Sequence, residues 1–146
     1  MSAAKPTWRA GDELESRTLP PVTRLQLIKY AGASEDYNPI HTVDEAAAET
    51  GLPSVIAHGM LTLATMSLLF SPYLEHGYVK ELQARFSGMV YPGDELTVGG
   101  RATGAEETTE GCLYAFDVHA KKEEDTVASG TVSFLVFGDC ANEGCR

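Results

Sequence analysis

The sequence predicts an α+β fold in which an antiparallel sheet curls around one buried helix. Residues 58–70 are apolar on nearly every side of a helix, which is typical of a helix buried on most of its faces. The chain that follows reads as a series of extended segments separated by turn-forming stretches. A curled sheet packed against the helix would cover the apolar surface of both.

Two short helices are predicted ahead of the buried one. Residues 22–34 carry apolar side chains at roughly helical spacing, and Thr23 can cap the first turn. This helix must end near Asp36, because Pro39 disfavours the helical conformation of the residue before it. A second short helix is predicted at 43–50, where a Gly and a Pro follow it.

After the buried helix the pattern changes to extended segments. They are predicted at 78–90, 95–103, 112–120 and 127–137. The stretches between them, Pro92-Gly93-Asp94, 104–111 and 121–125, have the composition of hairpin connections. Hairpins join antiparallel neighbours, so a meander is expected.

Length and charge limit the classes of function. A chain of 146 residues can bury one core but not two, so we expect one domain over 1–146. The net charge of −10 argues against nucleic acid or an anionic membrane as a partner. The apolar segment 59–70 is too short to span a bilayer, and residues 1–11 lack the apolar centre of a secretory signal. A cytoplasmic location is the expectation.

The three cysteines, Cys112, Cys140 and Cys145, are an odd number without CxxC spacing. Neither a disulfide framework nor a zinc site is therefore indicated. We expect thiols, buried or in the tail, in a reducing compartment.

One polar segment could carry acid–base chemistry. Asp36 and His41 lie five residues apart across a turn that Pro39 stiffens, and the Asn38 amide can bond to nearby backbone and hold the turn. A carboxylate and an imidazole that share one water suit proton transfer to and from that water. The alternative is that the Asp caps a helix and the His is an ordinary surface residue.

A second segment, Ala57-His58-Gly59-Met60, begins the buried helix. Backbone N–H groups lack partners there, and the helix dipole presents its positive end. Gly59 leaves room for a carbonyl to dock on its N–H as in an oxyanion hole, where one donor contributes about 3–4 kcal/mol. The alternative is a glycine needed only for tight packing.

These segments resemble the MaoC-like, or (R)-specific hydratase, group of hot-dog-fold proteins. The specific part is Asp36-x-Asn38-Pro39-Ile40-His41, followed at a similar distance by the Gly59 segment. The resemblance covers about 8–137 and leaves a short tail at 138–146. Two departures are Glu35, where many members have Gly, and Gly88-Met89, where a proline is usual.

The resemblance implies a hot-dog fold, a sheet wrapped round one long helix. It also implies that Asp36 and His41 are the catalytic pair, that Gly59 is the oxyanion donor and that Asn38 supports the site. Ser67 matches a family position close to the pair, although a serine within a helix is often bonded to its own backbone.

The implied activity is (R)-specific hydration of trans-2-enoyl thioesters, or the reverse dehydration, on coenzyme A or acyl carrier protein. No cofactor and no metal are expected, and His76 and His119 are taken as surface or strand residues. A homodimer is implied, with two sites near the subunit boundary. Two alternatives stay open: a hot-dog thioesterase, and one subunit of a two-chain dehydratase.

Overall fold

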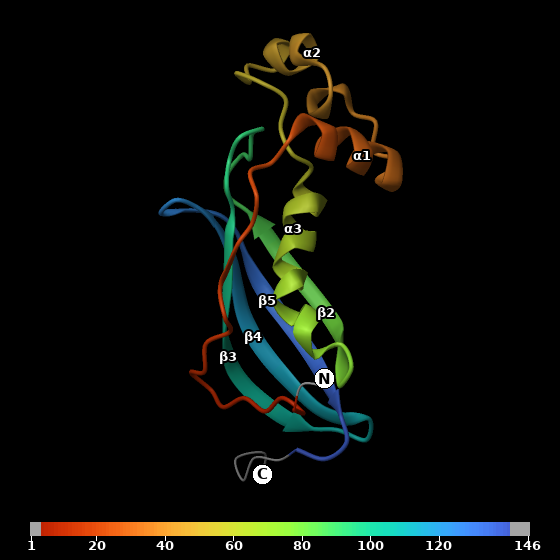
Figure 1. The fold of residues 1–146 in the computed structure, drawn as a ribbon, viewed down its shortest axis with the longest axis vertical. Helices are drawn as coiled ribbons and strands as arrows, with labels where there is room; N and C mark the ends of the chain where they lie inside the picture. The colour runs from red at the N-terminus through yellow and green to blue at the C-terminus, as the bar shows by residue number, and fades with distance from the viewer. Residues whose placement is uncertain (1–3, 141–146) are drawn as a thin grey trace.

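The computed structural model describes residues 4–140, and its centre is a curled antiparallel sheet wrapped around helix α3 (Figure 1). This confirms the predicted hot-dog fold. The helices are α1 (Arg24–Ser34), η1 (Pro39–His41), α2 (Asp44–Glu49), α3 (Gly59–Ser67) and η2 (Leu68–Tyr73). The strands are β1 (Arg17–Thr18), β2 (Gly77–Phe86), β3 (Thr97–Glu107), β4 (Gly111–Lys122) and β5 (Asp125–Phe137).

The strand order is β1-β3-β4-β5-β2, with every pair antiparallel. The meander from β3 to β5 is as predicted, but β2 pairs with β5 at the opposite edge. The hairpin predicted at Pro92-Gly93-Asp94 is therefore wrong, and that turn belongs to a crossover from β2 to β3. Hydrogen bonds hold it against the start of α1, since Gly93 N donates to Val22 O at 2.7 Å and Val22 N donates to Asp94 O at 2.9 Å.

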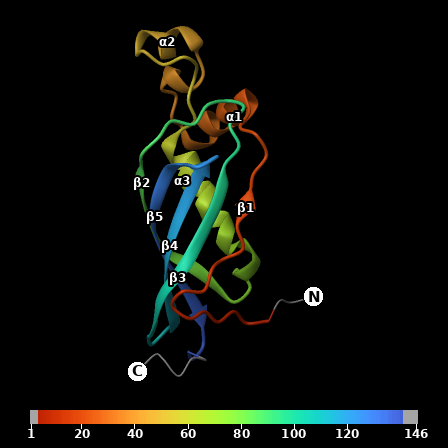
Figure 2. The same cartoon turned by 90° about the vertical axis from the view of Figure 1, so that its left-hand side faces the viewer.

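The core lies between the concave face of the sheet and the segment of α3 and η2 that packs against it, while α1 and α2 lie beyond one end of the sheet (Figure 2). Alternate residues of β4, among them Tyr114 and Phe116, are buried, as period-two alternation requires. Phe70 of η2 stacks on Phe134 at 5.3 Å between ring centroids and meets Phe116 edge-on at 5.0 Å. Trp8 meets Phe116 edge-on at 5.1 Å, so the N-terminal segment closes one end of the core.

Helix α3 is shorter and less buried than the sequence indicates. The α-helix ends at Ser67 and continues as the 3₁₀ helix η2, because Pro72 has no N–H and its ring clashes with the carbonyl four residues earlier. Met66 is fully buried, whereas Met60 is 57% exposed, so one face of the helix is not covered by this chain. Among residues 4–140, no helix is both long and apolar enough to cross a membrane.

The two short helices hold the polar segment between them. Thr23 caps α1 as predicted, its Oγ1 accepting from Gln26 N at 3.1 Å, and Glu35 ends the helix in the left-handed conformation. Arg24 of α1 donates to the Asp44 carboxylate of α2 at 2.9 Å, and this hydrogen bond lowers the pKa of Asp44. The chain between α1 and α2 is therefore tied at both ends.

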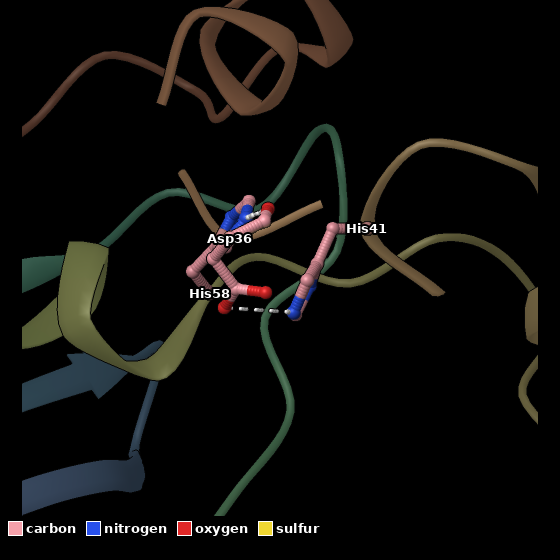
Figure 3. A group of neighbouring side chains, drawn as sticks. All are labelled: Asp36, His41 and His58. Atoms are coloured by element: carbon pink, nitrogen blue, oxygen red, sulfur yellow. Dashed lines mark hydrogen bonds and ion pairs between the residues drawn. The ribbon is translucent and has the colours of Figure 1, made fainter. Parts of the chain in front are cut away.

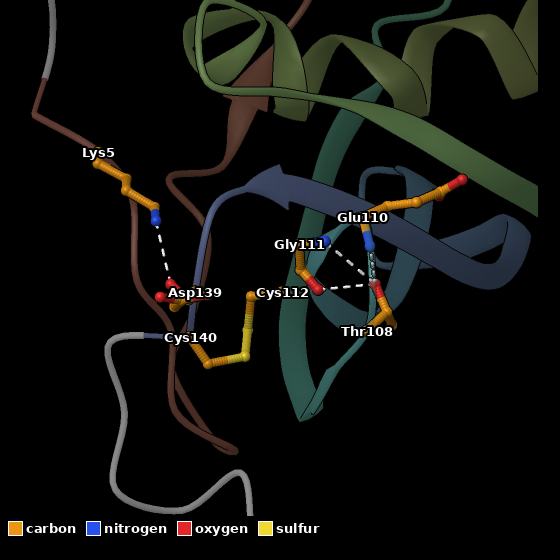
Figure 4. The surroundings of a disulfide bond; sticks show 7 residues. All are labelled: Lys5, Thr108, Glu110, Gly111, Cys112, Asp139 and Cys140. Carbon is orange, nitrogen blue, oxygen red and sulfur yellow. Dashed lines mark hydrogen bonds between the residues drawn. A yellow bond between two sulfur atoms is a disulfide. The ribbon is translucent and has the colours of Figure 1, made fainter.

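The structure also corrects the prediction that the cysteines form no disulfide. Cys112, at the start of β4, is bonded to Cys140, which follows β5 (Figure 4). The two strands are neighbours, and Gly111 faces Phe137 in their register, so the chain beyond β5 returns to the start of β4. Spacing along the sequence cannot show this proximity, because the strand pairing creates it. The third cysteine, Cys145, lies outside the described residues.

Candidate active site

The structure brings Asp36 and His41 together beside the N-terminus of α3 (Figure 3). Asp36 Oδ2 lies 3.9 Å from His41 Nε2, too far for a direct hydrogen bond. The Asp36 side chain is 51% exposed, whereas that of His41 is 9% exposed. An accessible carboxylate thus faces a nearly buried imidazole across a gap that can admit a small polar group.

A compact turn explains how residues five apart face each other. Asn38 N donates to Asp36 Oδ1 at 3.2 Å, and Ile40 N donates to Asn38 Oδ1 at 3.3 Å. Asn38 therefore caps η1, and Pro39 at its first position fits the helical φ. The Asn38 side chain is used within the turn, so it orients the pair through the backbone.

One hydrogen bond determines the tautomer of His41. Its Nδ1 lies 2.8 Å from Ile56 O, and a carbonyl can only accept, so Nδ1 carries the hydrogen. The other ring nitrogen, Nε2, then presents its lone pair towards Asp36 in the neutral ring. His41 is therefore ready to accept a proton at the atom that faces the gap.

His58 is the residue of this site to which sequence reasoning assigned no role. Its ring stacks on that of His41, with centroids 3.8 Å apart and planes 21° apart, and its Nε2 lies 3.2 Å from Asp36 O. The side chain is 2% exposed. The position of His58 directly before Gly59 was the one feature of the sequence that could have indicated a role in the site. Its stacking on His41 could not be predicted, because the two residues lie far apart along the chain.

Gly59 opens α3, and the helix has no side-chain cap at this end. Within residues 4–140, no hydrogen bond occupies the Gly59 N–H. A Cβ at this position would lie 3.2 Å from the Phe86 ring, so the glycine also allows close packing of the helix start against Phe86. The position at a helix N-terminus and the free donor together suit a docked carbonyl oxygen.

Ser67 is at the other end of α3. Its Oγ donates to Ala64 O at 2.6 Å, which is a bond within its own helix. At eight residues from Gly59 it lies about 12 Å further along the helix axis. The hydroxyl is thus engaged by backbone and makes no hydrogen bond with Asp36 or His41.

The same side chains could be considered for a metal ion, because Asp36, His41 and His58 offer ligand atoms within 4.8 Å of one another. An imidazole binds a metal along its ring plane, at about 2.0–2.1 Å from nitrogen. The two rings are stacked nearly parallel, so their lone pairs run side by side and do not converge on one ion. The arrangement suits proton transfer better than metal binding.

A family model, the MaoC like domain, matches residues 6–125 of the chain. The chain belongs to this MaoC-like family. The match includes the whole Asp36 to Gly59 region, whose resemblance to the family was apparent from the motifs. It ends at the start of β5, whereas the MaoC-like fold continues to the end of that strand.

Curated relatives of this MaoC-like chain are longer proteins. It is 32% identical over 126 residues, 82% of its length, to the fatty acid synthase beta subunit pkiC of Emericella nidulans. It is 31% identical over 121 residues, 81% of its length, to the peroxisomal enoyl-CoA hydratase 2 of Arabidopsis thaliana. The chain spans only 6% of the first relative and 35% of the second.

Solved structures share the fold. An (R)-hydratase from A. caviae superposes with a TM-score of 0.77 at 21% identity, covering 88% of this chain and 96% of that one. The R-hydratase PhaJ1 from Pseudomonas aeruginosa gives a TM-score of 0.71 at 25% identity, covering 88% and 81%. At 21% identity, the likeness to the A. caviae structure shows a shared fold and nothing more.

Proposed function

We propose that this MaoC-like domain is a hydro-lyase that adds water to trans-2-enoyl thioesters, or removes it from (R)-3-hydroxyacyl thioesters. The observation that carries the proposal is the 3.9 Å gap between Asp36 Oδ2 and His41 Nε2 beside the open N-terminus of α3. Relatives and fold neighbours with hydratase names support it.

In the proposed reaction, the thioester carbonyl docks on the Gly59 N–H, which strengthens its withdrawal of electrons from C3. A substrate water that bridges the gap, about 2.8 Å from each polar atom, can then attack C3. Asp36 accepts a proton from this water while the oxygen bonds to C3, and the enolate oxygen stays on the Gly59 N–H. The proton then passes from Asp36 to His41 Nε2 and from there to C2, which completes the addition and returns both groups to their starting state. Addition from one face is syn.

The proposal includes no cofactor, because the α,β-unsaturated thioester is its own electron sink. The carrier is coenzyme A or acyl carrier protein, and both present the same thioester to the site. A thioesterase would instead have to direct water at the carbonyl carbon. Asp36 and His41 can both contact one water, and the Gly59 N–H that would bind the carbonyl lies beside them. This arrangement favours the hydro-lyase over the thioesterase.

Crotonyl-coenzyme A mixed with the purified chain tests the proposal. We expect loss of the conjugated-thioester absorbance, with the (R)-3-hydroxyacyl thioester as product. Release of free thiol would identify a thioesterase. No turnover of short, long or branched enoyl thioesters, on either carrier, would contradict a complete hydro-lyase and favour a subunit that needs a second chain.

We also propose a homodimer joined through β2. This strand pairs with β5 on one side and is an edge on the other. The exposed apolar side chains include Tyr78 and Phe86 of β2 and Met60 of α3. A two-fold partner would extend the sheet and cover them. Sedimentation equilibrium should give twice the chain mass of 15.7 kDa, and a value of 15.7 kDa would contradict the dimer.

The single-domain organisation over 1–146 remains part of the proposal, as does the cytoplasmic location. The Cys112–Cys140 bond weighs against that location, because disulfides persist in oxidising compartments and are rare in the cytoplasm. A chain in which both residues are thiols fits the cytoplasm, and a chain that keeps the bond fits an oxidising compartment.

A further inference from the structure

We infer that His58 is a positioning residue that holds Asp36 and His41 in the geometry of the proposed reaction. The inference rests on the proposed function and adds a role for a side chain that exchanges no proton with substrate. His58 contacts both members of the pair, one through its ring face and the other through its Nε2.

The ring contact restrains His41. The bond from Nδ1 to Ile56 O, at 2.8 Å, fixes one end of the imidazole but leaves the ring free to swing about that bond. The parallel ring of His58, at 3.8 Å between centroids, blocks the swing on one face. The two restraints together keep Nε2 of His41 aimed across the gap.

The polar contact restrains Asp36. His58 Nε2 lies 3.2 Å from the Asp36 carbonyl, which can only accept, so Nε2 carries the hydrogen. Asp36 lies in an exposed turn with a half-exposed side chain, where a backbone anchor limits movement of the carboxylate. One side chain thus sets the distance between the two proton-transfer groups.

His58 is itself held firmly. It is 2% exposed, and the edge of Tyr30 from α1 meets its ring at 4.8 Å between centroids. It is also the residue directly before Gly59, so its backbone leads into the N–H proposed to bind the carbonyl. The same residue therefore links α1, the acid–base pair and the start of α3.

The second ring nitrogen argues against a role in packing alone. His58 Nδ1 is buried and has no hydrogen-bond partner among residues 4–140. An unpaired buried acceptor is unfavourable, and an apolar ring would fill the same space without that penalty. The hydrogen bond from Nε2 to Asp36 O is therefore the contact that distinguishes His58 from an apolar ring in the same place.

Two substitutions separate the two contacts. His58→Phe keeps a ring to stack on His41 and removes the donor to Asp36 O. His58→Gln keeps an amide donor and removes the ring. His119→Gln is the matched control, since it makes the same chemical change on β4, where His119 faces Ser129 of β5 and not the pair.

We expect kcat to fall by about 10-fold or more in both His58 variants, because small misplacements of reacting groups have effects of this size. KM should stay within about threefold and the thermal unfolding midpoint should show a folded protein, with His119→Gln like the wild type. In ¹H–¹⁵N spectra of the imidazoles, His41 should be a single Nδ1–H tautomer in the wild type, because Ile56 O accepts from Nδ1. Its ring cross-peaks should broaden in His58→Gln, where the ring is free to swing about that bond.

Unchanged kcat in both variants together with His41 ring cross-peaks as sharp as in the wild type would overturn the inference. A fall in activity that only matches a fall in the folded fraction would also overturn it. If the wild type turns over no enoyl thioester but the His41 ring cross-peaks still broaden in His58→Gln, the positioning role stands and the proposed function fails.

Discussion

Replacing Asp36 by Asn should lower kcat for enoyl-thioester hydration by at least about 10²-fold, because the amide cannot accept a proton from water. The substitution preserves size, and its side-chain oxygen can still accept from Asn38 N, as Asp36 Oδ1 does at 3.2 Å. The turn should therefore survive, and KM should change little. Initial rates with crotonyl-coenzyme A at saturating and limiting concentrations give both constants.

Glu35→Gln is the matched control for Asp36→Asn. It removes the same charge one residue earlier, from an exposed side chain at the end of α1. We expect its kcat to stay within about twofold of the wild type, since surface charges act weakly at a distance in salt. Equal losses in the two variants would mean that net charge matters and that Asp36 is not the base.

Replacing His41 by Ala should also lower kcat for enoyl-thioester hydration by at least about 10²-fold. If Asp36 and His41 act on one water, their effects should not add, and the double variant should be about as slow as the slower single variant. Fully multiplicative losses would show two independent roles and would contradict a shared water in the 3.9 Å gap.

Replacing Cys140 by Ser should lower the free energy of unfolding by about 3–4 kcal/mol, the loop-entropy estimate for a crosslink of this span. The bond joins residues 28 apart and ties the chain after β5 to the start of β4. The same region holds a hydrogen bond from Lys5 Nζ to Asp139 O at 3.1 Å, so the crosslink also stabilises the contact with the N-terminal segment (Figure 4).

Equilibrium unfolding in denaturant, with and without reductant, measures this effect. Wild type under reductant should match Cys140→Ser, and reductant should leave the variant unchanged. Cys145→Ser is the control, because it removes a thiol five residues later and leaves the Cys112 bond in place. Three free thiols titrated in the unfolded wild type, with Cys140→Ser as stable as the wild type, would show that the bond does not form.

Local features of the chain were predictable because short-range physics sets them. The Thr23 cap, the end of α1 ahead of Pro39 and the extended segment that forms β4 each depend on residues within a few positions of one another. The turn that joins Asp36 to His41 is equally local, since Asn38 and Pro39 shape it. The sequence by itself therefore determined the three α-helices and the four long strands, their order along the chain and the candidate pair.

Only the tertiary structure decided which distant segments meet. β2 lies beside β5 at one edge because a curled sheet can surround α3 only if the strand after the helix closes the far side. That closure, and the pairing that brings Cys140 to Cys112, depends on contacts across the whole fold. His58 acquires its place in the same way, since its ring meets His41 only after α3 has docked on the sheet and the turn has folded over it.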